Sequence, residues 1–265
     1  MSSAMTYKAL LVDFDGCFAG KTLMVSDPVR KAIASIINRT FVGLATGRGL
    51  QGTIQRIIGE VPLTGLQILQ GGPVIYDVNS KSIVWQKSMP PADVKSILDI
   101  VQSKNLIISA IENGEVYTNN DNPKDRFDPS INYKSLTDLP NQFVTKMAIT
   151  TGDSPTDAAE LAHMITYRFP SVKTIRWGHS HFNMYGIDIA ASTKLEAVHQ
   201  YLKILNLKPE EIVAVGDSYN DFPLLMSAGL KVAMGNAINE IKAIADYIAP
   251  SVDDDGLVWV IEKFF

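Results

Sequence analysis

Short apolar runs alternate with amphipathic segments near both ends of the chain. Ala9–Val12 and Phe41–Ala45 have the pattern of buried strands, and Pro28–Asn38 between them has helical spacing, with Ser26 or Asp27 as its N-cap. After residue 189 the alternation returns, with strands expected over Ile212–Val215, Lys231–Met234 and Tyr247–Ala249 and helices over Leu195–Leu205, Phe222–Ala228 and Ile238–Ala245. This order of elements predicts an α/β fold built on a parallel sheet.

The middle of the chain has a different pattern. A helix is expected over Ala92–Lys104, and two strands joined by Asn113-Gly114 follow it as a hairpin. A second helix beginning at Ser154-Pro155 is again followed by a pair of strands, ending near Asp188. We therefore expect a discontinuous core over residues 1–76 and 189–265, with an α+β domain inserted over 77–188.

Composition excludes several classes of protein. The 265 residues carry a net charge of −4 with no basic stretch, which argues against a nucleic-acid binder. No apolar run approaches membrane-spanning length, and no signal peptide pattern is visible at the start. Cys17 is the only cysteine, which favours a reducing compartment, so a cytoplasmic protein is expected. The oligomeric state is not indicated.

Two acids follow the first strand directly, in the sequence Asp13-Phe14-Asp15-Gly16. They lie at the carboxyl end of a parallel strand, where ligands bind in open α/β sheets. A D-x-D-G sequence also begins calcium loops, but residues 17–21 supply no further side-chain oxygen ligand. The two acids are therefore candidates for chemistry at the sheet edge.

Three further polar segments reach the same edge. Thr46 and Gly47 follow the second strand and precede an expected helix, a combination that suits a phosphate, although Thr46 could simply cap that helix. Lys194 lies where the chain re-enters the core, and a single lysine is usually a surface residue. After a later strand come four oxygen-bearing residues that suit Mg²⁺ but could also serve as helix caps: Asp217, Ser218, Asn220 and Asp221.

Taken together and in this order, these segments resemble the four motifs of the haloacid dehalogenase (HAD) superfamily. Its D-x-D-G-[TV] motif is represented by residues 13–17, its second motif by Thr46, its third by Lys194, and its fourth by residues 216–221. The resemblance implies a Rossmann-like core with an inserted cap of C2 type, of the Cof-like C2B subtype. Asp253-Asp254-Asp255-Gly256 before the last expected helix is also similar to Cof-like members.

The resemblance also implies a mechanism. Asp13 would attack phosphorus and form an aspartyl-phosphate, and Asp15 would act as general acid and then general base. Mg²⁺ would be held by Asp13, the carbonyl of Asp15 and Asp217, with Asn220 or Asp221 further out. Thr46, Gly47 and Lys194 would hold the phosphoryl oxygens, and the cap would select a small phosphorylated metabolite, with sugar phosphates as a candidate class.

Some features leave alternatives open. Cys17 replaces the Thr or Val of the first motif, and we expect it to be a small buried side chain. His179 and His181 in the inserted domain could contact substrate or metal, although ordinary strand residues are the simpler interpretation, and Arg126, Arg168 and Arg176 have no assigned role. A phosphomutase of the same superfamily and a catalytically silent binding protein are the competing functions. A receiver domain is disfavoured, since its phosphorylated Asp follows a later strand.

Overall fold

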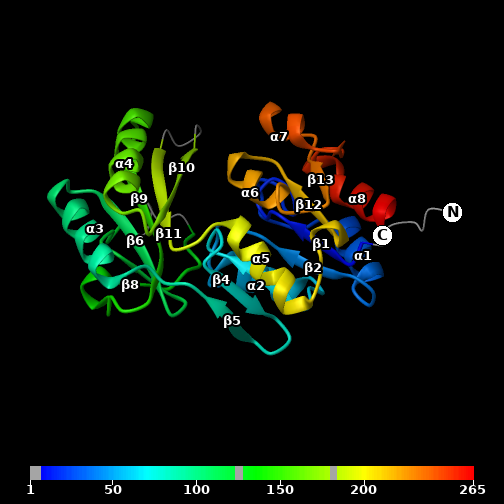
Figure 1. The fold of residues 1–265 in the computed structure, drawn as a ribbon, viewed down its shortest axis with the longest axis horizontal. Helices are drawn as coiled ribbons and strands as arrows, with labels where there is room; N and C mark the ends of the chain where they lie inside the picture. The colour runs from blue at the N-terminus through cyan, green and yellow to red at the C-terminus, as the bar shows by residue number, and fades with distance from the viewer. Residues whose placement is uncertain (1–6, 123–127, 180–183) are drawn as a thin grey trace. The chain divides into compact units, whose positions relative to one another are not determined.

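The chain forms two compact units in the computed structural model, which describes residues 7–122, 128–179 and 184–265 (Figure 1). The core unit comprises Met1–Arg48, Ile54–Trp85 and Lys194–Phe265. The inserted unit comprises Gly49–Thr53 and Gln86–Thr193.

The core unit is built on a five-stranded parallel sheet in the order β14-β13-β12-β1-β2. The strands are β1 (Ala9–Val12), β2 (Phe41–Leu44), β12 (Ile212–Gly216), β13 (Leu230–Ala233) and β14 (Tyr247–Ile248). Every residue of β1 is fully buried, as expected for a central parallel strand covered on both faces. Because all five strands run the same way, their carboxyl ends form one edge of the sheet. The parallel α/β core predicted from the sequence is confirmed.

Helices cover the core sheet. They are α1 (Asp27–Ile36), α2 (Thr53–Glu60), α5 (Lys194–Leu205), α6 (Phe222–Leu225), α7 (Asn239–Ile244) and α8 (Gly256–Phe264). Ser26, one of the two N-caps that the sequence predicted, caps α1 by accepting the Val29 N–H. Helix α5 packs Val198 and Tyr201 in one apolar cluster with Leu11 of β1. Among the described residues, no helix has the length and apolar character needed to cross a membrane.

A small antiparallel sheet extends the core unit beyond the expected boundary. Strands β3 (Leu66–Leu69), β4 (Val74–Asp77) and β5 (Ser82–Gln86) form it, in that order. Positive φ angles at Gln70, Gly71 and Gly72 make the tight turn that reverses the chain after β3. Because β5 pairs with β4, the contacts place the boundary at Trp85/Gln86 rather than after residue 76. At the other junction the core resumes at Lys194 rather than at residue 189.

The inserted unit is a six-stranded sheet in the order β10-β11-β9-β6-β7-β8, with two helices. Its strands are β6 (Ile107–Glu112), β7 (Glu115–Thr118), β8 (Tyr133–Ser135), β9 (Val144–Gly152), β10 (Lys173–His179) and β11 (Met184–Ala190), and its helices are α3 (Pro91–Ser103) and α4 (Pro155–Arg168). Ile97 of α3 and Ile165 of α4 join Ile149 and Ile187 of the sheet in one apolar cluster. The inserted α+β domain predicted from the sequence is confirmed. Strand β8 lies within residues 119–139, a polar, proline-containing stretch whose sequence predicts mostly loop.

Candidate active site

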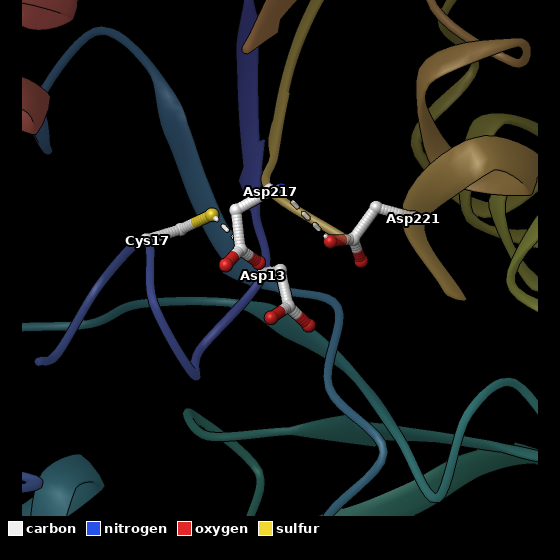
Figure 2. A group of neighbouring side chains, drawn as sticks. All are labelled: Asp13, Cys17, Asp217 and Asp221. Carbon is white, nitrogen blue, oxygen red and sulfur yellow. Dashed lines mark hydrogen bonds between the residues drawn. The ribbon is translucent and has the colours of Figure 1, made fainter. Parts of the chain in front are cut away.

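Acidic side chains from two neighbouring strands meet at the carboxyl edge of the core sheet. Asp13 follows β1 and Asp217 follows β12, and the Asp13 N–H donates to the Val215 carbonyl at 3.0 Å. Asp13, Asp217, Asp221 and Cys17 each offer one ligand atom, and these atoms all lie within 4.8 Å of one another. Figure 2 shows the Asp13 and Asp217 carboxylates directed toward the same small region. The two acids quoted from separate motifs are therefore neighbours in space.

Lys194 is buried among these acids. Its Nζ lies 2.6 Å from Asp13 Oδ1 and 2.6 Å from Asp221 Oδ1, and its side chain is 1% exposed. Burial by itself would lower the pKa of Lys194, but the two carboxylates outweigh burial and raise that pKa. The first residue of α5 is thus a charged ammonium ion that links the loops after β1 and β12.

Asp221 uses both of its carboxylate oxygens within the protein. Oδ1 accepts from Lys194, and Oδ2 accepts the N–H groups of Asp217 at 3.0 Å and Ser218 at 3.1 Å. The neighbouring Asn220 accepts a hydrogen bond from the Ser218 hydroxyl through its Oδ1. Both residues therefore shape the loop after β12, and Asp221 also holds Lys194 in place.

Gly16 allows Asp217 to approach the first motif closely. Its φ is +81°, and a Cβ built there would lie 2.3 Å from Asp217 Oδ2. Real Cβ atoms essentially never come that close, so any side chain at this position would have to displace the Asp217 carboxylate. The glycine of the D-x-D-G motif is thus required both for the turn and for the position of the second acid.

The cluster carries more negative than positive charge. Burial, followed by the negative charge of Asp221, raises the pKa of Asp217 to about 7 even though Lys194 lowers it. The same two causes raise the pKa of Asp13 well above its usual range. Asp13, Asp217 and Asp221 surround one lysine, so a cation would relieve their repulsion.

Thr46 lies at the same sheet edge, but its surroundings differ from the prediction. It is fully buried, follows β2, and its Oγ1 accepts the Arg48 N–H at 3.1 Å. The helix expected soon after Gly47 is α2, which begins at Thr53, so residues 48–52 separate its N-terminus from Gly47. Gly52, with φ of +73°, belongs to the loop that delays the helix. Thr46 therefore does not cap α2, which removes the simpler interpretation of this threonine.

Asp15 is more exposed than the residues of the buried cluster and is bound by Arg48. The Arg48 guanidinium nitrogens lie between 2.8 and 3.2 Å from the Asp15 oxygens, and the Asp15 side chain is 49% exposed. Arg48 was not among the candidate site residues predicted from the sequence. It could have been found from its position, because Arg48 lies two residues after Thr46 and follows β2, the strand next to β1.

Asn236 is a second residue of the site that sequence reasoning missed. Its Nδ2 donates to the Gly16 carbonyl at 2.9 Å and to Asp217 Oδ2 at 3.4 Å, and its Oδ1 accepts the Val252 N–H at 2.9 Å. Asn236 thereby joins three loops around Asp217. It could have been found from its position just after the strand ending at Ala233, at the same sheet edge.

Cys17 is buried beside Asp217. Its Sγ lies 3.7 Å from Asp217 Oδ1, to which the thiol donates. Burial, followed by the charge of Asp217, raises the pKa of Cys17 well above its usual value, so the thiol stays protonated. The small buried side chain expected here is the one observed.

Of the candidates in the inserted unit, the structure describes Arg168 at the end of α4 and Arg176 and His179 on β10. The Arg168 guanidinium lies 5.6 Å from the centroid of the adjacent Phe169 ring, and Arg176 pairs with Ile187 in the register of β10 and β11. His179 is the last residue of β10, whereas Arg126 and His181 lie outside the described residues. The acids, lysine and threonine described above therefore make up the candidate active site.

Comparisons with known proteins agree with this geometry. A family model described as haloacid dehalogenase-like hydrolase matches residues 10–261. The Bacillus subtilis protein YcsE, named a 5-amino-6-(5-phospho-D-ribitylamino)uracil phosphatase, is 27% identical over 269 residues, which cover 97% of this chain and 95% of YcsE. The match to the B. subtilis stress response protein YhaX, at 36% identity over 101 residues, covers 38% of this chain and 34% of YhaX.

Solved structures show the same fold. A haloacid dehalogenase-like hydrolase from Bacteroides thetaiotaomicron has a TM-score of 0.84 at 24% identity, covering 98% of this chain and all of the other. A sugar phosphatase of HAD subclass IIB has a TM-score of 0.79 at 21% identity, covering 97% of this chain and 98% of its own. The likeness spans both the parallel-sheet core and the inserted unit.

Proposed function

The chain belongs to the haloacid dehalogenase-like hydrolases, and on that premise we propose that it is a Mg²⁺-dependent phosphatase of small phosphorylated metabolites. The observation that carries the proposal is Asp13, a buried carboxylate at the end of β1, held by Lys194 and placed beside Asp217. Such an arrangement gives a nucleophile a fixed direction and supplies positive charge for a phosphoryl group. Neither a plain helix cap nor a structural ion pair needs this surplus of acids.

The donor set fits a magnesium ion. Asp13 and Asp217 supply carboxylate oxygens, the hard ligands that Mg²⁺ prefers, and the carbonyl of Asp15 is the third proposed ligand. Asp221 and Asn220 are proposed to act around the ion, because their own oxygens already accept hydrogen bonds. When bound, the ion neutralises charge, so that an anionic nucleophile can approach an anionic phosphate.

Asp13 and Asp15 divide the chemistry. One Asp13 oxygen is bound by Lys194, and the carboxylate attacks phosphorus to form an aspartyl-phosphate as the bond to the leaving oxygen breaks. Asp15 gives its proton to that leaving oxygen, and then takes a proton from the water that attacks phosphorus as the bond from phosphorus to the Asp13 oxygen breaks. Phosphate leaves, and both carboxyl groups return to their starting state.

Thr46, Gly47 and Lys194 are proposed to bind the phosphoryl oxygens. An ammonium group has three N–H donors, and Lys194 uses two of them on Asp13 and Asp221, which leaves one for the phosphate. The Thr46 oxygen accepts the Arg48 N–H, and its own hydroxyl hydrogen can therefore donate. The backbone N–H of Gly47 completes the proposed set.

The substrate is proposed to be chosen by the inserted unit. One relative is named a phosphatase of a phosphorylated ribitylamino-uracil, and one structural neighbour is a sugar phosphatase. Both names support small phosphorylated metabolites, with sugar phosphates as a candidate class. The absence of a basic stretch and the single cysteine support a cytoplasmic enzyme that acts on neither nucleic acid nor membrane.

The test is phosphate release from a panel of phosphorylated metabolites. We expect turnover with Mg²⁺, loss of activity to background with EDTA, recovery when Mg²⁺ is returned in excess, and poor recovery with Ca²⁺, whose larger and looser coordination misplaces the phosphate. Transfer of phosphate to a second sugar position without release would identify a phosphomutase. Tight binding of phosphometabolites without turnover would identify a silent binding protein.

A further inference from the structure

Arg48 and Asp15 form a side-chain pair that joins the loop after β2 to the loop after β1. Arg48 Nη2 lies 2.8 Å from Asp15 Oδ1, and Nε lies 3.2 Å from Oδ1 and 2.9 Å from Oδ2. A guanidinium that contacts both oxygens of a carboxylate fixes its plane as well as its distance. The direction of Asp15 is therefore set by Arg48.

Arg48 itself is held firmly. Its backbone N–H donates to Thr46 Oγ1, and its carbonyl accepts the Gln70 N–H at 2.8 Å. Its guanidinium carbon lies 5.6 Å from the centroid of the Phe14 ring, and its side chain is 13% exposed. Asp15, at 49% exposed, is the more open partner. The well-anchored residue thus orients the exposed one.

The geometry points to a positioning role, which rests on the function proposed above. We propose that Arg48 orients Asp15 for proton transfer and leaves Oδ2 as the oxygen that carries the proton. A carboxylate has about four lone-pair positions. Oδ1 receives contacts from Nη2 and Nε, whereas Oδ2 receives a contact from Nε alone and keeps one position open. The proton passes from Asp15 to the leaving oxygen and later returns from water, and Arg48 neither gains nor loses one.

A phosphate-binding role for Arg48 makes a different prediction. An arginine that held the phosphoryl group would bind every phosphomonoester alike, so its loss would raise KM for all substrates. A residue that acts through the general acid should instead matter most when the leaving group needs a proton. The two roles can therefore be separated by varying the leaving group.

The experiment compares Arg48→Met, Asp15→Ala and the double variant with the wild type. The substrates are phosphomonoesters whose leaving groups range from activated aryl to alkyl. For Arg48→Met we expect kcat to fall about 10- to 100-fold with alkyl leaving groups and to fall less with activated aryl phosphates. The fall with alkyl groups is only part of the rate enhancement that a general acid supplies. KM should stay within about twofold of the wild-type value. Arg48→Lys keeps the positive charge but cannot contact both Asp15 oxygens as a guanidinium does, so it should recover only part of the lost kcat.

The double variant supplies the decisive comparison. If Arg48 acts through Asp15, Arg48→Met should lower the single-turnover rate of wild type about 10- to 100-fold with an alkyl phosphate, but should change that of Asp15→Ala with the same substrate by less than about twofold. A matched control is Arg56→Met, which breaks another arginine–carboxylate pair of the core unit, with Glu60 at 3.0 Å, and should leave the leaving-group dependence unchanged. Equal KM increases for all substrates, or full additivity in the double variant, would overturn the proposal.

A failure of the proposed function would look different. If the wild type hydrolyses no phosphomonoester, that function falls, and the same four proteins still test the pair by unfolding in urea. Contacting residues should give a non-additive change of at least about twofold in the unfolding equilibrium constant, the lower limit for residues in contact. Additive effects on both unfolding and kinetics would show that Arg48 does not orient Asp15.

Discussion

Buried acids of the inserted unit and of the core unit have different surroundings. In the inserted unit, Glu112 is 1% exposed and accepts three backbone N–H groups, those of residues 141–143. Asp128 accepts from Thr53 and Ser130, and although burial acts to raise its pKa, these hydrogen bonds outweigh burial and lower it. In the core unit, burial and neighbouring acids raise the pKa values of Asp13 and Asp217.

The difference separates acids that stabilise a fold from acids that are held for chemistry. A buried carboxylate surrounded by local donors is satisfied and needs nothing further. A carboxylate left beside other carboxylates, with one lysine between them, is kept at a cost that a bound cation or phosphoryl chemistry can explain.

The largest effect is expected for Asp13→Asn. The amide has nearly the same shape but is a poor nucleophile, so phosphate release should fall about 10⁴-fold or more. Circular dichroism and thermal unfolding should show a folded protein, because Lys194 keeps Asp221 as a partner. Near-normal turnover by the folded variant would rule out a covalent intermediate on Asp13.

A matched pair of glycines tests how tightly the core site is built. Gly16 and Gly114 have φ angles of +81° and +80°, but a Cβ at Gly16 would meet Asp217, whereas one at Gly114 meets nothing within 4 Å. Gly16→Ala should lower kcat/KM about 10²-fold by displacing a carboxylate. Gly114→Ala should cost only backbone strain, about 1–3 kcal/mol of unfolding free energy, with normal kinetics. Similar kinetic losses in both variants would mean that Asp217 does not depend on this contact.

The smallest expected effects are the opposite pH dependences that Asp217 and Asp128 give to the free energy of unfolding. The folded pKa of Asp217, about 7, lies above its ordinary value of 3.8, so the metal-free protein should lose stability as pH rises from about 4 to about 7. Asp217→Asn should reduce this slope by the share of Asp217, worth a few kcal/mol at most, since one pKa unit is about 1.4 kcal/mol, whereas Asp13, whose pKa is also raised, keeps its own share. Urea unfolding in EDTA measures it.

Asp128 should behave in the reverse sense. Its folded pKa is lowered, so its contribution is present above its ordinary value of 3.8 and is lost as pH falls through the folded value. Asp128→Asn should therefore lower stability by about 1 kcal/mol at neutral pH and by less in acid, because charge-assisted hydrogen bonds disappear. A variant that loses as much stability in acid as at pH 7 would remove Asp128 from the contrast.

The sequence was sufficient for the elements whose signal is local. The apolar run before Asp13 and the one before Gly216 identify β1 and β12, and parallel pairing then brings their acids together. Lys194 was harder to interpret, because its partners Asp13 and Asp221 are 181 and 27 residues away in sequence. No local pattern distinguishes such a buried lysine from a surface one.

Other features depend on contacts that the sequence does not display. Strand β8 has three residues and owes its assignment to pairing with β7, so the segment alone resembles a loop. Strand β5 pairs with β4 and therefore belongs to the core unit. The boundary between the two units thus lies at Trp85, later in the chain than the expected residue 76. The role of Asn236 rests on hydrogen bonds to two other loops and lies equally beyond local pattern.

The position of Lys194 at the junction of the two units constrains how such a protein can be rebuilt. It is the first residue of the core unit after the insertion, and Thr193 before it still belongs to the inserted unit. Exchange of the insertion for one from another enzyme, as a route to new selectivity, would therefore cut the chain beside a reactive centre. At the first junction the cut falls at the end of β5, whereas at the second junction a single added residue would directly precede α5, whose first residue places the ammonium group against its two acids.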